Sequence, residues 1–335
     1  MAFEDYQQRY EQPVNQGAPN VFTLPQGGNI LRGNVVVDAT VTITNAGAAG
    51  TAVMDAGPTG LIRNIKIKAS KAAGSRYYNG LIVDCIPRSL LRYATVEHSG
   101  KYVAELFGNT LGNGAAGVYD VYLSIPIYFQ ECTLLNSVQT ALNMNPVDSQ
   151  GLPVYSAVQV KVDIAASLAE IFSGTAGTMA IEGMLRWYDE RLVLTSDTIP
   201  LVQEDHELLI QAAQNRLVDP AMPADGAFLS WLILAEQGQP GLALSDVILN
   251  RLHVQSSGVE YETRWEELRQ SMIDEGFYDP STTMTGQFFK DWTHGIWQNS
   301  NAAAQLMHHF AVNNPSGAGL DQLRIYTRRM FGFPS

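Results

Sequence analysis

Apolar and polar residues alternate along several segments of this chain. Residues 37–44 alternate valine, alanine and isoleucine with aspartate and threonine, and residues 121–129 and 158–164 repeat the pattern. A period of two is typical of β-strands with one buried face and one face in water. Pro126 lies within the second of these segments, and because proline donates no ladder hydrogen bond, it predicts an edge strand or a bulge.

One local theme occurs twice. A proline-containing turn and an apolar strand occupy residues 57–68, and a second strand follows at 79–84. The same order recurs at residues 222–234 and 242–249, about 165 positions later. Repetition of a β unit at this distance predicts a tandem duplication.

A helix is predicted in the second half. Ser257 and Glu260 have capping-box spacing, and Gly276 supplies a stop. The apolar residues that recur between them at helical spacing are Tyr261, Trp265, Leu268 and Met272. Residues 86–97 have a weaker helical pattern at the corresponding place in the first half.

The remaining segments complete a β-rich pattern. Residues 179–193 predict a pair of strands, and residues 208–218 fit either a strand or a helix. The closing strands are predicted at residues 305–312 and 320–330.

The length and the repeat predict two domains. A chain of 335 residues is long for one domain, and the polar segment 195–200, which ends in proline, lies where the repeat requires a boundary. We therefore expect a polar N-terminal arm at residues 1–20, a first unit at 21–196 and a second at 197–335. Short strands between glycine and proline turns favour a mainly β chain of two tandem antiparallel jelly-roll β-sandwiches with short inserted helices. The strand order stays open.

The N-terminal arm carries aromatic residues that are candidates for interaction. Phe3, Tyr6 and Tyr10 lie at helical spacing, and Pro13 ends any helix there. Such a segment is expected to be ordered mainly by what it contacts.

Composition limits the possible functions. The net charge of −12 disfavours extensive binding to nucleic acid, and no sequence-specific nucleic acid is expected. The start of the chain predicts no signal peptide, and the longest apolar run, residues 227–235, is too short to span a bilayer, so we expect a soluble protein. Cys85 and Cys132 are expected to be buried free thiols, although a single bridge between them stays open.

No motif for catalysis is convincing. Residues 112–117 match G-x-G-x-x-G, but a strand follows instead of a helix, which favours a flexible loop. Residues 204–207, Glu-Asp-His-Glu, would point to opposite faces of a strand, so a solvated acidic loop is favoured over a metal site; His308 and His309 have the same defect. A nucleophile elbow, zinc-spaced cysteines and a P-loop are all missing from the sequence. We expect no enzyme activity, cofactor or metal.

Two groups of residues near the C-terminal end of the sequence suggest specific binding functions. A group of aromatic residues could form a sugar-binding platform, but the core or a subunit contact is the favoured alternative. These residues are Phe277, Tyr278, Phe288, Phe289, Trp292 and Trp297. Arg324, Arg328 and Arg329 form a basic C-terminal end that could dock onto an acidic neighbour, or onto phosphate groups of lipid or genome.

The layout as a whole resembles the double jelly-roll major capsid proteins of tailless icosahedral phages with an internal membrane. The resemblance rests on the polar arm, on residues 22–28 before the first alternating strand, and on the turn and strand at 57–67. It also rests on the short strand ending near Asp84, followed by an apolar helical stretch, and on the repetition of these events from Pro223.

The resemblance implies a homotrimer with a nearly hexagonal outline that tiles an icosahedral virion shell. The arm would lock neighbouring trimers, and the protein would assemble in the host cytoplasm. Penton, minor capsid or membrane proteins of the virion are implied partners, with lipid or genome at the inner face. The alternative is a carbohydrate-binding β-sandwich protein, receptor-binding or lectin-like. A sandwich-fold hydrolase is a third reading, without a motif to support it.

Overall fold

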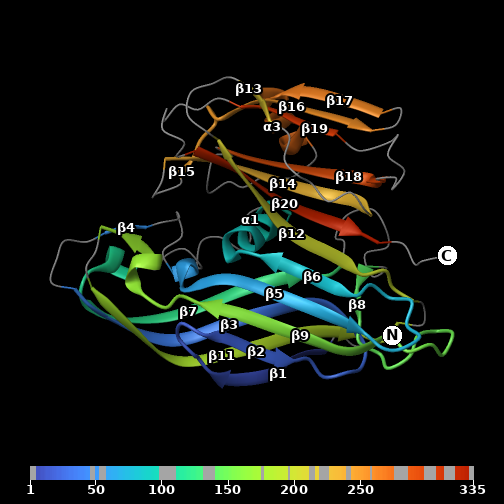
Figure 1. Ribbon diagram of the computed structural model, residues 1–335, viewed down its shortest axis with the longest axis horizontal. Coiled ribbons are helices and arrows are strands. Elements are labelled where there is room, and N and C mark those ends of the chain that lie inside the picture. The colour runs from blue at the N-terminus through green and yellow to red at the C-terminus, as the bar shows by residue number, and fades with distance from the viewer. Residues whose placement is uncertain are drawn as a thin grey trace.

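The protein is mainly β, in two units (Figure 1). The computed structural model describes residues 5–45, 50–52, 58–97, 111–130, 140–174, 177–194, 197–210, 216–218, 226–238, 243–256, 259–274, 286–297, 307–312 and 321–331. Within these residues, no helix is long and apolar enough to cross a membrane.

Eight long strands and one helix build the first unit. The strands are β1 (Asp5–Pro13), β2 (Pro19–Thr23), β3 (Asn29–Thr44), β5 (Ile62–Lys71), β6 (Gly80–Cys85), β7 (Gly117–Tyr128), β9 (Tyr155–Ile164) and β11 (Thr178–Leu192). Helix α1 (Pro87–Glu97) lies between β6 and β7 in sequence. Shorter elements are β4 (Thr51–Ala52), β8 (Leu142–Asn143), β10 (Phe172–Ser173) and the 3₁₀ turns Pro58–Leu61, Leu111–Gly114 and Leu168–Glu170.

The second unit has the same inventory. Its strands are β12 (Leu201–Ile210), β13 (Arg216–Val218), β14 (Ala227–Gln237), β16 (Leu249–Ser256), β17 (Val259–Arg264), β18 (Gln287–Trp297), β19 (Met307–Val312) and β20 (Asp321–Met330). Helix α3 (Trp265–Asp274) follows β17, and the two-residue strand β15 (Ala243–Leu244) pairs with the end of β14.

Strand order is identical in the two units. Numbering the long strands of each unit from one to eight, one sheet has the order first, eighth, third, sixth: β1-β11-β3-β7 and β12-β20-β14-β18. The other has the order second, seventh, fourth, fifth: β2-β9-β5-β6 and β13-β19-β16-β17. The helix is inserted between the fifth and sixth strands in both. Two antiparallel sheets in this order form a jelly roll, so the predicted pair of tandem jelly rolls is confirmed.

The predicted alignment of the repeat is wrong, although two units with the same strand order are present. Strand β5, in the first copy of the theme, is the fourth strand of its unit, whereas β14, in the second copy, is the third. The equivalent of β14 is β3. Residues 242–249 are also mostly outside strands, because only Ala243–Leu244 and the first residue of β16 are extended there. A turn followed by an apolar strand recurs several times within one jelly roll, so this pattern cannot fix which strands correspond.

The strands predicted from alternation are present. Pro126 lies on β7, which is the end strand of its sheet among the described residues, as its missing N–H requires. The closing segments form β19 and β20, and residues 201–210 and 216–218 are strands. Residues 179–192, however, belong to the single strand β11 rather than to a pair, and Val193 lies just beyond its end.

The helix in the second unit begins later than predicted. Glu260 and Tyr261 lie on β17 and pair with β16, and the helix starts at Trp265. The Glu267 carboxylate accepts hydrogen bonds from the Arg264 backbone N–H (3.1 Å) and the Thr263 hydroxyl (2.9 Å). These bonds lower the pKa of Glu267. The capping glutamate is therefore Glu267, at the third helical position, and not Glu260.

A short parallel contact joins the two units. Gln203 and Glu204 of β12 pair with Val83 and Asp84 of β6. Through this contact, strands from both units form one continuous nine-stranded sheet. Residues 197–200 lie between β11 and β12 and have no regular structure.

Candidate functional site at the junction of the two jelly rolls

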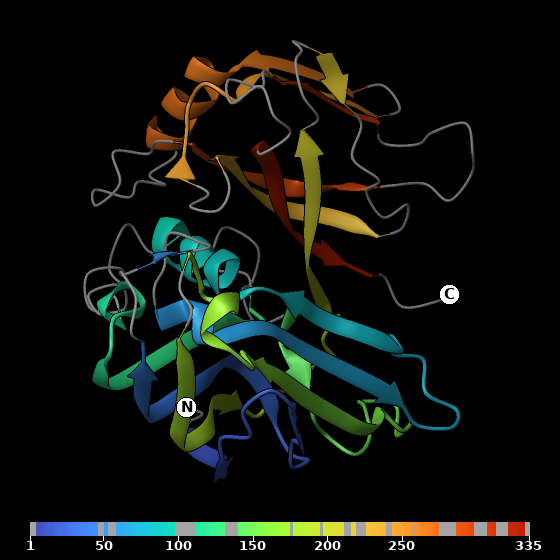
Figure 2. The same cartoon turned by 60° about the vertical axis from the view of Figure 1, so that its left-hand side comes forward.

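Helix α1 lies between the two units (Figure 2). Pro87 is its first residue, where the missing N–H costs nothing and the fixed φ suits a helix. On one side α1 contacts β7 and β5 of its own unit. On the other side the Tyr93 ring meets the rings of Tyr326 (centroids 5.2 Å apart) and Phe289 (5.7 Å) in the second unit. The helix therefore belongs to both cores.

A buried ion pair links the helix to the second unit. The Arg88 guanidinium lies 2.7 Å from the Glu236 carboxylate on β14, and the two side chains are 2% and 0% exposed. Glu236 also accepts a hydrogen bond from Gln322. Charges buried to this extent need a partner, because desolvation costs several kcal/mol per ion.

The three C-terminal arginines lie at the same junction, and the prediction that they form a basic surface is wrong. Arg324 pairs with Glu207 (2.7 Å) and lies 3.8 Å from Glu236. Arg324, Arg328 and Arg329 are 5%, 0% and 3% exposed. They are therefore enclosed within the chain, where they cannot dock onto a neighbour or a phosphate-bearing surface.

Arg328 and Arg329 point to opposite sides of β20. Arg328 donates hydrogen bonds to the Tyr93 hydroxyl and to the carbonyls of Tyr128 (3.2 Å) and Gln130 (2.8 Å), all in the first unit. Arg329 is paired with Glu204 on β12. Arg328 thus ties the last strand of the second unit to the end of β7, which strengthens the junction.

Asp205 adds a titratable group to the junction. Its Oδ2 accepts a hydrogen bond from the Ile86 backbone N–H (2.7 Å), and the Ser89 hydroxyl also interacts with this carboxylate. Burial raises the pKa of Asp205 from its ordinary value of 3.8 to about 6, against the opposing charge of Arg324. The folded protein therefore binds a proton at this carboxyl well above the pH at which the unfolded chain does.

We expect replacement of Asp205 by asparagine to remove part of the pH dependence of stability. The wild type should gain stability over the variant as the pH falls from 8 to 4, by about 2.5 kcal/mol, because the folded state takes up the proton first. Burial lowers the pKa of the neighbouring His206. Because His206 is present in both proteins, its titration contributes equally to both and cancels in the difference. Urea unfolding of both proteins at several pH values measures the difference; a constant difference would contradict a raised pKa.

Residues 5–13 form strand β1 in the first sheet, so a helical arm at residues 1–20 is wrong for this segment. Arg9 pairs with the buried Asp189 carboxylate (3.0 Å), and the Tyr10 ring stacks on Phe22 (centroids 4.3 Å apart). Tyr6 lies on the opposite, outer face, stacked on Tyr188 (5.7 Å) and 47% exposed. Phe3 lies outside the described residues. The segment is thus ordered by its own unit, and of the two described aromatic candidates Tyr6 is the exposed one.

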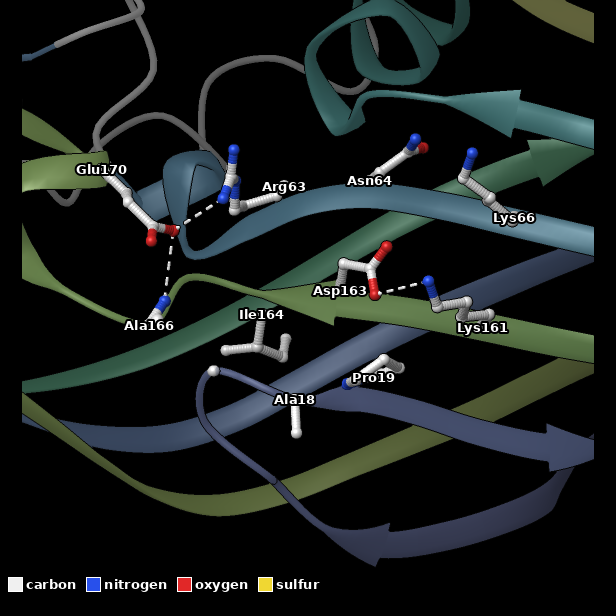
Figure 3. A pocket seen from close by; sticks show the side chains of 11 residues that line it. Ala18, Pro19, Arg63, Asn64, Lys66, Lys161, Asp163, Ile164, Ala166 and Glu170 are labelled. Carbon is white, nitrogen blue, oxygen red and sulfur yellow. Dashed lines mark hydrogen bonds and ion pairs between the residues drawn. The ribbon is translucent and has the colours of Figure 1, made fainter.

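A surface hollow of about 610 Å³ lies beside β5 and β9 (Figure 3). Each cation that lines it is already paired: Arg63 with Glu170 (3.1 Å), Lys161 with Asp163 (3.1 Å), and Lys66 with Asp84 (2.9 Å). These pairs neutralise the basic side chains, so the hollow provides little attraction for a phosphate or another anion.

The remaining sequence candidates fit structural roles. Residues 112–114 belong to the 3₁₀ turn Leu111–Gly114, and Gly117 is the first residue of β7, so a strand and not a helix follows the glycines, as predicted. Residues 204–207 lie on strand β12 rather than in a loop, and the described residues contain no cluster of three potential metal ligands. Cys85 is a buried free thiol whose pKa is raised by burial, while Cys132 lies outside the described residues.

The sugar-binding platform is not supported by the described aromatic residues. Phe288 and Phe289 are 0% and 2% exposed and belong to the core, as the favoured alternative predicted. Phe277 and Tyr278 lie outside the described residues, and the side chains of Trp292 and Trp297 are not described.

Comparison with known proteins gives matches in structure only. No protein-family model matches the sequence, and neither does any curated protein. The solved structure of the STIV MCP, from Sulfolobus Turreted Icosahedral Virus, is similar with a TM-score of 0.65 and 10% identity, over 99% of this chain and 97% of that chain. The major capsid protein P2 from Bacteriophage PM2 is similar with a TM-score of 0.56 and 10% identity, over 99% and 98%.

A third similar structure is a chain of the PBCV-1 virus capsid, with a TM-score of 0.55 and 11% identity, over 98% of this chain and 94% of that chain. All three similarities extend over both units, and identity this low concerns the fold. The chain therefore has the double jelly-roll fold that is found in viral major capsid proteins.

Proposed function

We propose that this protein is the major capsid protein of an icosahedral virion, a structural subunit without enzymatic activity. The observation that carries the proposal is the strand order, which is identical in two units joined by a buried ion pair. The similarity to capsid proteins from end to end supports it, because nearly the whole length of each matched chain is covered.

A chain with two equivalent jelly rolls can build a nearly hexagonal assembly from three copies. Three copies place six similar jelly rolls around one axis, which gives a nearly hexagonal outline with only threefold symmetry. Closed rings of this kind form through head-to-tail contacts, in which one surface of a copy meets a different surface of the next. We propose the homotrimer as the unit that tiles the shell in the virion.

Light scattering tests the proposal directly. Purified protein is expected to have three times the mass of the 36.6 kDa chain, and electron micrographs should show six-lobed particles with threefold symmetry. A stable monomer that binds glycans would instead support the carbohydrate-binding alternative and would overturn the proposal.

The further partners implied by the resemblance stay predictions. These are neighbouring trimers, penton, minor capsid or membrane proteins, and lipid or genome at the inner face. Arg324, Arg328 and Arg329 do not supply the last of these contacts, because they are buried. Deleting residues 1–20 would not test a locking arm in isolation either, since it removes β1 from its sheet.

A further inference from the structure

The two inserted helices occupy equivalent places but have different surroundings. Helix α1 contacts β7 and β5, the sixth and fourth strands of its unit, and α3 contacts β18 and β16, the sixth and fourth strands of the other. All residues of α1 from Pro87 to Val96 are buried. Helix α3 buries only Trp265, Leu268 and Met272, and it lies at the outside of the second unit (Figure 2). Ile273 on its outer side is 46% exposed.

One sheet of the second unit packs over helix α1. Its contacts across the junction, described above, are with strands of the sheet β12-β20-β14-β18 in the second unit. Nine of the ten residues of β20 are buried without alternation, as expected for a strand whose sheet is covered on both faces.

The equivalent sheet of the first unit, β1-β11-β3-β7, has one uncovered face. Exposure alternates along β11 and along the first half of β7. The exposed side includes Val118 (69%), Tyr122 (66%) and Tyr6 (47%), which are large apolar or aromatic side chains. Several such side chains on one face are typical of an interaction surface.

We infer that α3 of one copy packs on the outer face of the sheet β1-β11-β3-β7 of the next copy, and so repeats between chains the contact that α1 makes within the chain. The inference rests on the proposed function. Because the two surfaces of this contact differ and lie on different units, successive copies join head to tail. Three copies would then contain three internal and three external contacts of one kind, which closes a ring of six jelly rolls.

Strand edges fit the same arrangement. Within the chain, β12, a first strand, pairs in parallel with β6, a fifth strand. The corresponding pair between copies consists of β1 and β17, and each is an end strand of its sheet among the described residues. Unpaired strand edges are ready sites for association with another chain.

The charges make the contact between copies weaker than the internal one. The second residue of α1 is Arg88, which pairs with Glu236, whereas the second residue of α3 is Glu266. The receiving face carries Asp120 and Glu182, both exposed. Repulsion between acidic surfaces is screened by salt, so the apparent dissociation constant of the trimer should fall as ionic strength rises.

Single substitutions test this contact. Val118→Asp on the sheet and Ile273→Asp on the helix should each raise the apparent dissociation constant of the trimer at least about tenfold, measured by sedimentation or light scattering. Val21→Asp is the matched control, because Val21 is 47% exposed on β2 in the other sheet of the first unit. The control should leave the trimer intact. Circular dichroism checks that each variant is folded.

The outcomes separate this inference from the proposed function. A monomeric wild type would overturn the proposed function and the inference with it. A trimeric wild type whose Val118→Asp and Ile273→Asp variants associate as well as Val21→Asp would overturn the inference alone. Hydroxyl-radical footprinting of the wild type needs no variant: Tyr122 and Ile273 should be protected in the trimer and reactive after dissociation, and equal reactivity in both states would also overturn the inference.

Discussion

Replacement of Glu236 by glutamine is expected to destabilise the protein by about 3–5 kcal/mol, the cost typical of breaking a buried ion pair. The change keeps the shape of the side chain but leaves the Arg88 guanidinium, which is 2% exposed, without its carboxylate. It also removes the nearby negative charge that favours Arg324, at 3.8 Å. Urea unfolding at pH 7 measures the loss, provided that the transition is two-state.

An exposed ion pair supplies the control. Glu170→Gln removes the carboxylate partner of Arg63, whose side chain is 60% exposed, and should cost less than about 1 kcal/mol. Adding Arg88→Met to Glu236→Gln should recover part of the loss, because the buried charge that lost its carboxylate is then removed. If Glu236→Gln costs no more than Glu170→Gln, the buried pair does not hold the junction.

Replacement of Trp187 by alanine should cost a similar amount, about 3–5 kcal/mol, through loss of buried surface and creation of a cavity. Trp187 is 0% exposed, and its indole N–H donates a hydrogen bond to Asp189 (2.9 Å). The ring lies directly over Gly33, where a Cβ would come within 2.3 Å of it. Thermal and urea unfolding would both report the loss.

The neighbouring residue on the same strand is the matched control. Tyr188 points to the outer face, where it stacks on Tyr6, and Tyr188→Ala should cost about 1 kcal/mol or less. Gly33→Ala should be costly in the wild type and milder in the Trp187→Ala background, because the two changes share one space. Equal costs for Trp187→Ala and Tyr188→Ala would contradict the assignment of their faces.

The sequence predicts those strands that keep one face in water. Alternation locates β3, β7 and β9 because each has a wet side that demands polar residues. It predicts less for the second unit, where β14 and β20 are covered on both sides and lose the alternation. The apolar run at residues 227–235, which only Ser230 interrupts, is the signal of that double cover, and it points to the junction.

The buried arginines could not be placed from the sequence. Arginine is rarely buried, so a group of three at one end of a chain indicates a surface. Only the fold brings Glu236 and Glu204 on neighbouring strands against Arg324 and Arg329. The partners lie more than 80 positions away in the sequence, where no local pattern connects them.

The N-terminal tyrosines show a second reason why side-chain positions could not be predicted from the sequence. A spacing of four residues puts Tyr6 and Tyr10 on the same face of a helix, and also of a regular strand. The register of β1 shifts between Gln8 and Tyr10, so that Tyr6 faces outward and Tyr10 faces Phe22. A bulge of this kind depends on the partner strand and leaves no clear mark in the sequence.

The continuous sheet through β6 and β12 has a mechanical consequence. To hinge, the two jelly rolls would have to break the parallel pairing of Gln203 and Glu204 with β6 and separate Arg88 from Glu236 in a dry interior. The two jelly rolls are therefore expected to move together as one rigid body. If the protein forms a closed shell, as proposed, the curvature of that shell would therefore be absorbed at the contacts between molecules.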